Sequence, residues 1–96
     1  MQNNTTILDC NSRMINVGDI VNLFGMIGTV HFECGAYGIG FDEIDWDRID
    51  EKIYDITGYE HSDFCRNDNF ISFWELIWNF NCEDNCCNVV EIMDNM

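Results

Sequence analysis

Residues 17–32 read VGDIVNLFGMIGTVHF, so β-branched and aromatic residues are separated by glycines at the spacing of turns. This pattern predicts a strand, a tight turn and a second strand. A third strand is expected over residues 36–41, because Tyr37, Ile39 and Phe41 fall on one face and glycines on the other. The three strands together are typical of a small, bent antiparallel β-sheet or barrel.

The hydrophobic period changes after residue 41 to intervals of three and four, at Trp46, Ile49, Ile53 and Ile56. Asp42 or Asp45 is available as the N-cap of a helix, and Gly58 as its stop. The sequence therefore predicts one amphipathic helix packed against the sheet. The expected fold class is α+β.

The rest of the chain gives weaker patterns. Residues 59–69 are polar and predict a loop, whereas residues 70–80, FISFWELIWNF, are almost wholly apolar and fit either a helix or a strand. A cysteine-rich turn over 81–88 and a short closing strand over 89–93 are expected. The polar start, residues 1–6, is expected to be frayed. All 96 residues are expected to form a single domain.

The charge of the chain is strongly unbalanced, with 18 Asp and Glu against 4 Lys and Arg and a formal net charge of −14. Self-repulsion of this size opposes compaction, which suggests that the charge has a use. We expect a basic protein surface as the partner, such as a groove built to hold nucleic acid. Direct binding of nucleic acid or of an anionic membrane is disfavoured. The alternative is that the charge serves solubility or reflects a saline habitat.

The predicted helix has a carboxylate side, on which Glu43, Asp47, Glu51 and Asp55 each lie four residues from the last. This spacing places the carboxylates about 6 Å apart along the helix. The residues expected to contact a partner are Asp42, Glu43, Asp45, Asp47, Asp50, Glu51 and Asp55. A solvated helix face without a partner is the alternative interpretation.

Catalytic chemistry is not indicated by any motif. The candidate bases for a nucleophilic site are His31 and His61, and the position of His31 within a strand favours a structural role. The sequence has no Gly-x-x-x-x-Gly-Lys loop, no His-Glu-x-x-His and no calcium-loop spacing. We expect that the protein is not an enzyme.

The cysteines suggest a metal site. Cys82, Cys86 and Cys87 form a local cluster, and Cys65 lies upstream in the polar loop. These four thiolates are the candidate ligands of a structural zinc ion in tetrahedral coordination. Because the spacing differs from the Cys-x-x-Cys pair typical of zinc sites, free and buried cysteines are the alternative. Two acidic residues follow Cys82 and disfavour a reactive thiolate.

The sequence also bears on the compartment. No apolar run reaches the roughly 18 residues of a membrane span. The N-terminus has neither the basic region nor the apolar stretch of a secretion signal. We expect an intracellular protein whose 6 cysteines are free or bound to metal rather than paired in disulfides.

Three glycine-led segments, VGDIV (residues 17–21), GTVHF (28–32) and GAYGI (35–39), resemble the YopX-like proteins of bacteriophages and prophages. The later segments SFWEL (72–76) and CNVVEIMDN (87–95) are similar to the Phe-rich segment, cysteine-bearing turn and terminal strand of that family. The resemblance implies a bent barrel core and a phage origin. It leaves out the predicted helix and the cysteine loop, and the family's usual C-terminal tail is missing.

Small acidic phage proteins without a catalytic site are similar, as a class, to anti-CRISPR inhibitors of bacterial defence. The resemblance therefore implies an anti-CRISPR protein in the cytoplasm of a bacterial host, aimed at a class 2 CRISPR effector nuclease. The Asn- and Ile-rich composition is typical of AT-rich hosts and favours type II, subtype II-A. A carboxylate-rich surface would compete with nucleic acid for the basic channel of such a nuclease.

Two other functions stay open at this point. An acidic accessory protein would use the same carboxylates to dock on a host DNA-binding protein. A small zinc or redox protein would instead be built around residues 82–87.

Overall fold

The computed structural model describes residues 4–66, 68–83 and 85–93 of the chain. Its elements are β1 (Asn4–Leu8), β2 (Met14–Asn16), β3 (Ile20–Leu23), β4 (Met26–Glu33), β5 (Ala36–Gly40), α1 (Trp46–Thr57), β6 (Phe70–Ser72), α2 (Phe73–Asn79) and β7 (Val90–Ile92). Five strands form an antiparallel sheet in the order β6-β5-β4-β3-β7, and β1 pairs separately with β2. Within the described ranges the larger sheet is open. The α+β prediction is confirmed, with a sheet in place of the barrel alternative.

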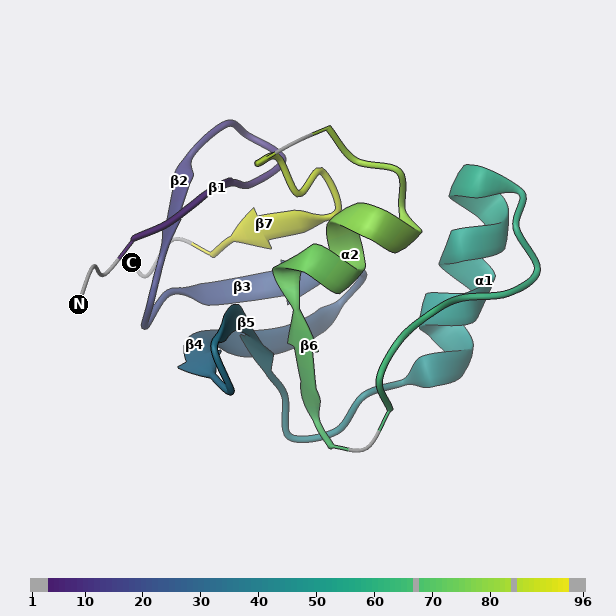
Figure 1. The fold of residues 1–96 in the computed structure, drawn as a ribbon, viewed down its shortest axis with the longest axis horizontal. Coiled ribbons are helices and arrows are strands. Elements are labelled where there is room, and N and C mark those ends of the chain that lie inside the picture. The colour runs from purple at the N-terminus through teal and green to yellow at the C-terminus, as the bar shows by residue number, and fades with distance from the viewer. Residues whose placement is uncertain (1–3, 67, 84, 94–96) are drawn as a thin grey trace.

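The helices occupy different positions around this sheet (Figure 1). α2 lies across the face of the sheet, whereas α1 stands beyond its end, beside the turn between β3 and β4. The core lies between the sheet, α2 and the inner side of α1. Its fully covered members are Ile15, Val21, Leu23, Val30, Ile39, Ile49, Ile71, Phe73, Leu76, Cys87 and Val90. Neither helix in the described ranges has the length and apolar character needed to cross a lipid bilayer.

The predicted hairpin forms between β3 and β4, and the predicted third strand, β5, pairs with β4 in a second hairpin. Each hairpin uses a two-residue turn. Phe24 and Gly25 have φ angles of 55° and 93°, and Cys34 and Gly35 have φ angles of 51° and 81°. Two consecutive positive φ angles are the mark of a type I′ turn, whose twist matches that of the paired strands. The predictions of strands over 17–32 and 36–41 are thereby confirmed.

Residues 70–80, which fitted either class, contain both a strand and a helix. At the junction Ser72 keeps an extended backbone, with φ of −73° and ψ of 151°. Its Oγ accepts from the Glu75 N–H at 3.2 Å, and Glu75 Oε1 accepts from the Ser72 N–H at 3.1 Å. This reciprocal capping box starts α2. The described residues therefore contain a second helix besides the predicted amphipathic one, and it lies in the segment whose class the sequence left open.

The approach of β6 to β5 depends on a glycine. A Cβ at Gly38 would lie 2.5 Å from the carbonyl oxygen of Ile71, which is closer than a side chain tolerates. The absence of a side chain lets β6 pair with β5 and brings α2 onto the sheet.

The predicted limits of α1 are confirmed at both ends. Asp45 is the N-cap and accepts a hydrogen bond from the Arg48 N–H at 3.1 Å, and Gly58 ends the helix with a φ of 80°. Ile49 and Ile53 are buried as expected. Ile56 was expected to share their apolar face but is 52% exposed, because the last turn of α1 stands outside the core.

The expectation of a frayed N-terminus over residues 1–6 is wrong for residues 4–6, which belong to β1; residues 1–3 lie outside the described ranges. Thr5 Oγ1 donates to the carbonyl oxygen of Ile15 at 3.0 Å, so a polar side chain of β1 is satisfied by β2. The prediction failed because this pairing, rather than local hydrophobic periodicity, forms the strand.

Asp9 ties the β1–β2 turn to the last strand. Its carboxylate is buried and accepts from the N–H groups of Asn11 at 2.9 Å, Arg13 at 2.8 Å and Ile92 at 2.9 Å. Arg13 Nη2 donates to the carbonyl oxygen of Ile92 at 2.7 Å. These bonds fix β7, whose prediction within residues 89–93 is confirmed.

Candidate interaction site

Five of the seven predicted partner-contact carboxylates are exposed and have no charged or hydrogen-bonded partner among the described residues. We call this group the acidic face, and its members are Asp42, Glu43, Asp47, Glu51 and Asp55. Among the described residues, none forms an ion pair or a side-chain hydrogen bond with these carboxylates. Their charge is therefore not neutralised by any described side chain. The exposure that the helical spacing predicted is confirmed for Asp47, Glu51 and Asp55. Glu43, expected on the same helix face, is exposed but precedes α1, because the helix begins only after its N-cap Asp45. Contact with a partner stays a prediction.

The other two predicted carboxylates are used within the chain. Asp45 caps α1 and forms an ion pair with Arg48 at 3.7 Å. Asp50 Oδ1 accepts from Arg66 Nη2 at 2.6 Å and from Ser62 Oγ at 3.2 Å. Asp50 therefore anchors the loop after α1 and is less available to a partner than the acidic face.

Arg66 is held by an aromatic ring as well as by Asp50. Its guanidinium carbon lies 4.6 Å from the ring centroid of Trp46, and its Nη2 donates to Ser62 Oγ at 2.8 Å. We call Trp46, Asp50, Ser62 and Arg66 the Arg66 clamp. It combines stacking on an indole with an ion pair, a geometry suited to the planar guanidinium group.

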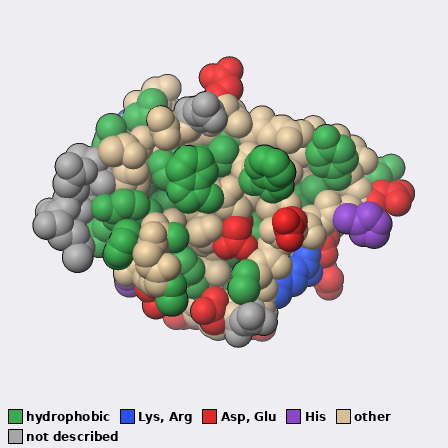
Figure 2. Space-filling view, in the orientation of Figure 1, with side chains coloured by type: hydrophobic (Ala, Val, Ile, Leu, Met, Phe, Trp, Pro, Cys, Tyr) green, Lys and Arg blue, Asp and Glu red, His purple; other side chains and the backbone are tan. Residues whose placement is uncertain are grey.

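α2 exposes two tryptophans that the sequence did not single out. Trp74 is 60% exposed and Trp78, one helical turn later, is 76% exposed. Phe73, Leu76 and Ile77 are buried on the opposite side of the helix. Figure 2 shows hydrophobic side chains gathered on the face where α2 lies, with carboxylates between and beside them. Exposed apolar groups that gather in this way mark interaction sites in soluble proteins.

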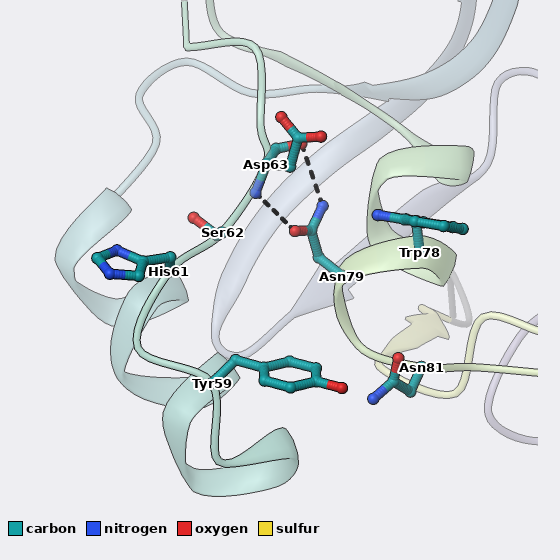
Figure 3. Close-up of a pocket in the computed structure, with 7 residues that line it drawn as sticks. All are labelled: Tyr59, His61, Ser62, Asp63, Trp78, Asn79 and Asn81. Atoms are coloured by element: carbon teal, nitrogen blue, oxygen red, sulfur yellow. Dashed lines mark hydrogen bonds between the residues drawn. The ribbon is translucent and has the colours of Figure 1, made fainter.

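A hollow of about 600 Å³ lies between α2 and the loop that follows α1 (Figure 3). We call it the aromatic hollow, and its lining residues are Tyr59, His61, Ser62, Asp63, Trp78, Asn79 and Asn81. Trp78 projects from α2 on one side, and Tyr59 reaches from the loop toward Asn81 on the other. Ring faces and polar groups thus meet in one open depression.

The walls of the aromatic hollow are fixed by hydrogen bonds. Asn79 Oδ1 accepts from the Asp63 N–H at 2.7 Å, and Asn79 Nδ2 donates to the Asp63 carbonyl at 3.3 Å. Glu75 Oε2 accepts from the Cys65 N–H at 2.7 Å. Two side chains of α2, one turn apart, therefore hold the loop at a set distance from the helix.

The C-terminal end of α2 fixes the last wall of the hollow. The Cys82 N–H donates to the Ile77 carbonyl at 3.0 Å, and the Asn81 N–H donates to the Trp78 carbonyl at 3.5 Å. Asn81 has a φ of 54°. This arrangement is a Schellman motif, in which asparagine is one of the few residues that adopts the left-handed conformation readily.

A second, smaller hollow of about 270 Å³ lies on the other side of α2, against Trp74. Phe32 and Tyr37, partners across β4 and β5, line it with their ring centroids 4.8 Å apart. Thr6, with an unusual φ of 60° for a β-branched residue, also lines this hollow. The two exposed tryptophans therefore border separate depressions.

The four predicted zinc ligands differ in their exposure to solvent. Cys65 is exposed in the loop, Cys82 and Cys86 are half-buried, and Cys87 is buried. Among the described residues, no three Cys, His, Asp or Glu side chains come together as a metal site would require. Structural zinc stays a prediction. It can be tested with a variant in which Cys82, Cys86 and Cys87 are changed to Ser, by measuring the bound zinc and the thermal stability.

Cys82 and Cys87 interact directly. A hydrogen bond from the Cys87 thiol lowers the pKa of Cys82 to about 6. Burial acts in the opposite direction and raises this pKa, and a hydrogen bond with the backbone of Asn88 lowers it by a smaller amount. The same interaction, together with burial, raises the pKa of Cys87. The expectation that acidic neighbours keep Cys82 unreactive therefore omitted a local hydrogen bond.

The two candidate bases are both exposed: His31 lies on β4 and His61 at the aromatic hollow. No protein-family model, curated protein or solved structure matches this chain. The resemblance to YopX-like proteins therefore stays a prediction from the strand motifs, and functional inference depends on the surfaces described above.

Proposed function

We propose that the chain is a phage-encoded anti-CRISPR inhibitor that binds a type II effector nuclease and blocks the loading of nucleic acid. The acidic face is the contact surface in this proposal, and no catalytic step is involved. The partner type rests on the resemblance to phage proteins, whereas the mode of binding rests on the chemistry of the surface.

The observation that supports this mode of binding is that the carboxylates of the acidic face are exposed. Asp47, Glu51 and Asp55 lie on successive turns of α1, all exposed and unpaired among the described residues. Asp42 and Glu43 continue the charge before the helix begins. A rigid helix carries this row, so its charges keep a fixed spacing when a partner approaches.

The physical effect of such a row is long-ranged. A carboxylate row attracts a Lys- and Arg-lined groove before contact and speeds association, and this attraction weakens as salt increases. Once docked, the row occupies positions that phosphate groups of the guide or target strand would otherwise take. Inhibition follows from this competition for the same basic groups.

The first experiment is a pull-down against a type II effector nuclease, with and without guide RNA, at about 0.1 M and about 0.5 M salt. Binding that weakens at high salt and prevents DNA loading is the expected result. A chain that binds a host DNA-binding protein but no nuclease would instead support the accessory-protein alternative.

A charge-reversal pair then locates the contact. Asp47→Lys with Glu51→Lys is expected to slow association roughly tenfold and to flatten its salt dependence. The matched control is Glu33→Lys with Glu83→Lys, which makes the same charge change at two exposed positions away from α1. If both double variants slow association equally, net charge alone is responsible and the acidic face is not the contact.

A further inference from the structure

We propose that the aromatic hollow binds an arginine side chain of a protein partner, with its guanidinium stacked on Trp78 and paired with Asp63. This site lies on α2 and the following loop, apart from the acidic face. The inference does not require that the partner be a nuclease.

The cations of the chain are all engaged elsewhere. Its 4 basic residues are Arg13, Arg48, Lys52 and Arg66. Arg13 pairs with Asp9, Arg48 pairs with Asp45, Lys52 lies over the ring of Phe24, and Arg66 belongs to the Arg66 clamp. Since these are all the Lys and Arg residues of the chain and each has a partner, a guanidinium or ammonium group that stacks on Trp78 has to come from another molecule.

The aromatic hollow offers the same kinds of group that the Arg66 clamp uses. In the clamp, an indole stacks on the guanidinium, a carboxylate pairs with it and a hydroxyl accepts from it. In the hollow, Trp78 supplies the indole, Asp63 the carboxylate and Tyr59 a second ring with a hydroxyl. The chain therefore already uses this combination of groups once, to hold Arg66.

The groups that would receive the arginine are available. Trp78 is 76% exposed and Tyr59 is 56% exposed. The backbone N–H and carbonyl of Asp63 bond to Asn79, whereas no described residue donates to its carboxylate. A ligand therefore has the indole face and the carboxylate to bind without displacing an internal partner.

The hollow is also formed before a ligand arrives. Asn79 is only 7% exposed and fixes the loop at Asp63, and Glu75 fixes it again at Cys65. A site that is already ordered loses less conformational entropy when it binds, which favours affinity.

Charge complementarity identifies the occupant. A second copy of the chain would bring another net charge of −14 to this face, and mutual repulsion opposes that association. A cationic segment is attracted instead. Arginine suits the site better than lysine, because its planar group stacks on an indole and forms two parallel bonds with a carboxylate.

The test is a titration of the full chain with a short glycine-spaced peptide that contains two arginines, followed by NMR of the indole N–H groups. At about 0.5 M salt the Debye length is about 4 Å, so binding through the acidic face is screened. The matched peptides carry two lysines or two neutral citrullines in the same positions. We expect the Trp78 signal to shift in a saturable way, the Trp46 signal to stay, and the lysine peptide to bind at least about threefold more weakly.

Three variants locate the effect. Trp78→Ala is expected to weaken the arginine peptide at least about fivefold, while Trp74→Ala, an exposed tryptophan one turn away, changes affinity less than about twofold. Asp63→Asn keeps the backbone bonds to Asn79 and is expected to weaken binding about twofold to threefold. Far-ultraviolet circular dichroism checks that each variant folds.

Several outcomes would overturn the inference. Equal binding of the arginine and lysine peptides, an unmoved Trp78 signal at saturation, or an equal loss from Trp74→Ala and Trp78→Ala would each exclude the proposed site. The double variant Asp47→Lys with Glu51→Lys is expected to bind the arginine peptide normally at this salt concentration. Failure at the aromatic hollow is thereby distinguished from failure of the acidic face.

Discussion

α1 and α2 each begin at a side-chain cap and bury one side in the same core, but their outer sides differ in kind. α1 presents carboxylates and α2 presents the indoles of Trp74 and Trp78. Charge acts over about 8 to 10 Å in physiological salt, whereas stacking acts only at contact. Under the two proposals above, α1 would govern the rate at which a partner associates and α2 the lifetime of the complex.

The two helices are also attached differently. α1 is joined to the sheet mainly through the β3–β4 turn, where Arg48 Nη1 donates to the Phe24 carbonyl at 3.1 Å and Lys52 lies over the Phe24 ring. α2 lies on the sheet, is closed at both ends by capping motifs and holds the adjacent loop. We therefore expect substitutions in α2 to affect stability more than equivalent substitutions in α1.

The largest expected effect is a difference in stability between substitutions on the buried and the exposed side of α2. Phe73→Ala empties a fully buried position and is expected to lower the free energy of unfolding by about 3–5 kcal/mol. The adjacent Trp74→Ala is expected to change it by less than about 0.5 kcal/mol, because that indole is 60% exposed. Urea unfolding measures both. Equal losses would mean that α2 does not pack as described.

A smaller effect is expected where α2 holds the loop. Asn79→Ala removes the bonds to the Asp63 backbone and is expected to lower stability by about 1–3 kcal/mol. Hydrogen exchange at the Asp63 N–H should also become faster.

Asn81→Gly is the control for this substitution, since glycine adopts the left-handed conformation at a helix end at least as well as asparagine. It is expected to leave the stability and the Asp63 exchange rate unchanged. Faster exchange in both variants would show that the end of α2, rather than Asn79, restrains the loop.

A still smaller effect is expected at the ends of α1. Asp45→Ala removes the N-cap and is expected to lower stability by about 1 kcal/mol. Asp55→Ala is expected to raise it by a few tenths of a kcal/mol, since a negative charge in the last turn is unfavourable to the helix dipole. Thermal unfolding of the two variants, run in parallel, measures both changes in stability. Opposite signs would show that the effect of removing a carboxylate depends on its position along α1, and equal signs that it depends on charge alone.

The last expected effect is a change in the reactivity of Cys82, just after α2, rather than in stability. Because the pKa of Cys82 is lowered to about 6, its thiolate should form as pH rises through that value and react with iodoacetamide near neutral pH. Mass spectrometry of the alkylated chain from pH 5 to 9 measures this dependence.

Cys87→Ala removes the thiol that donates to Cys82, and the alkylation of Cys82 is then expected to begin at higher pH. Reaction of Cys82 that follows that of exposed Cys34 at every pH would contradict the hydrogen bond between Cys82 and Cys87.

The sequence predicted the elements whose signals are local. Type I′ hairpins need glycine in a short turn, and Gly25 and Gly35 provide it. The limits of α1 followed from Asp45 and Gly58. The start of α2 had a local signal that the sequence analysis did not use, because Ser72 and Glu75 have the spacing of a capping box.

The candidate site was only partly predictable. The exposure of Asp47, Glu51 and Asp55 followed from a helical spacing of four residues. The exposure of Trp74 and Trp78 did not, because an almost wholly apolar segment has no polar side to show which residues face solvent. Contact with the sheet buries Phe73 and Leu76 and leaves the tryptophans outside.

The sequence by itself determined the charge of the protein, its two tight hairpins and the ends of α1, since each depends on composition or on residues a few positions apart. The tertiary structure decided which carboxylates stay unpaired and where the indoles meet a loop. Those outcomes depend on contacts between distant residues, such as Asp50 with Arg66, Asn79 with Asp63 and Asp9 with Ile92. Side chains of the same type therefore end in different environments, because folding neutralises or buries some of them and leaves the others exposed.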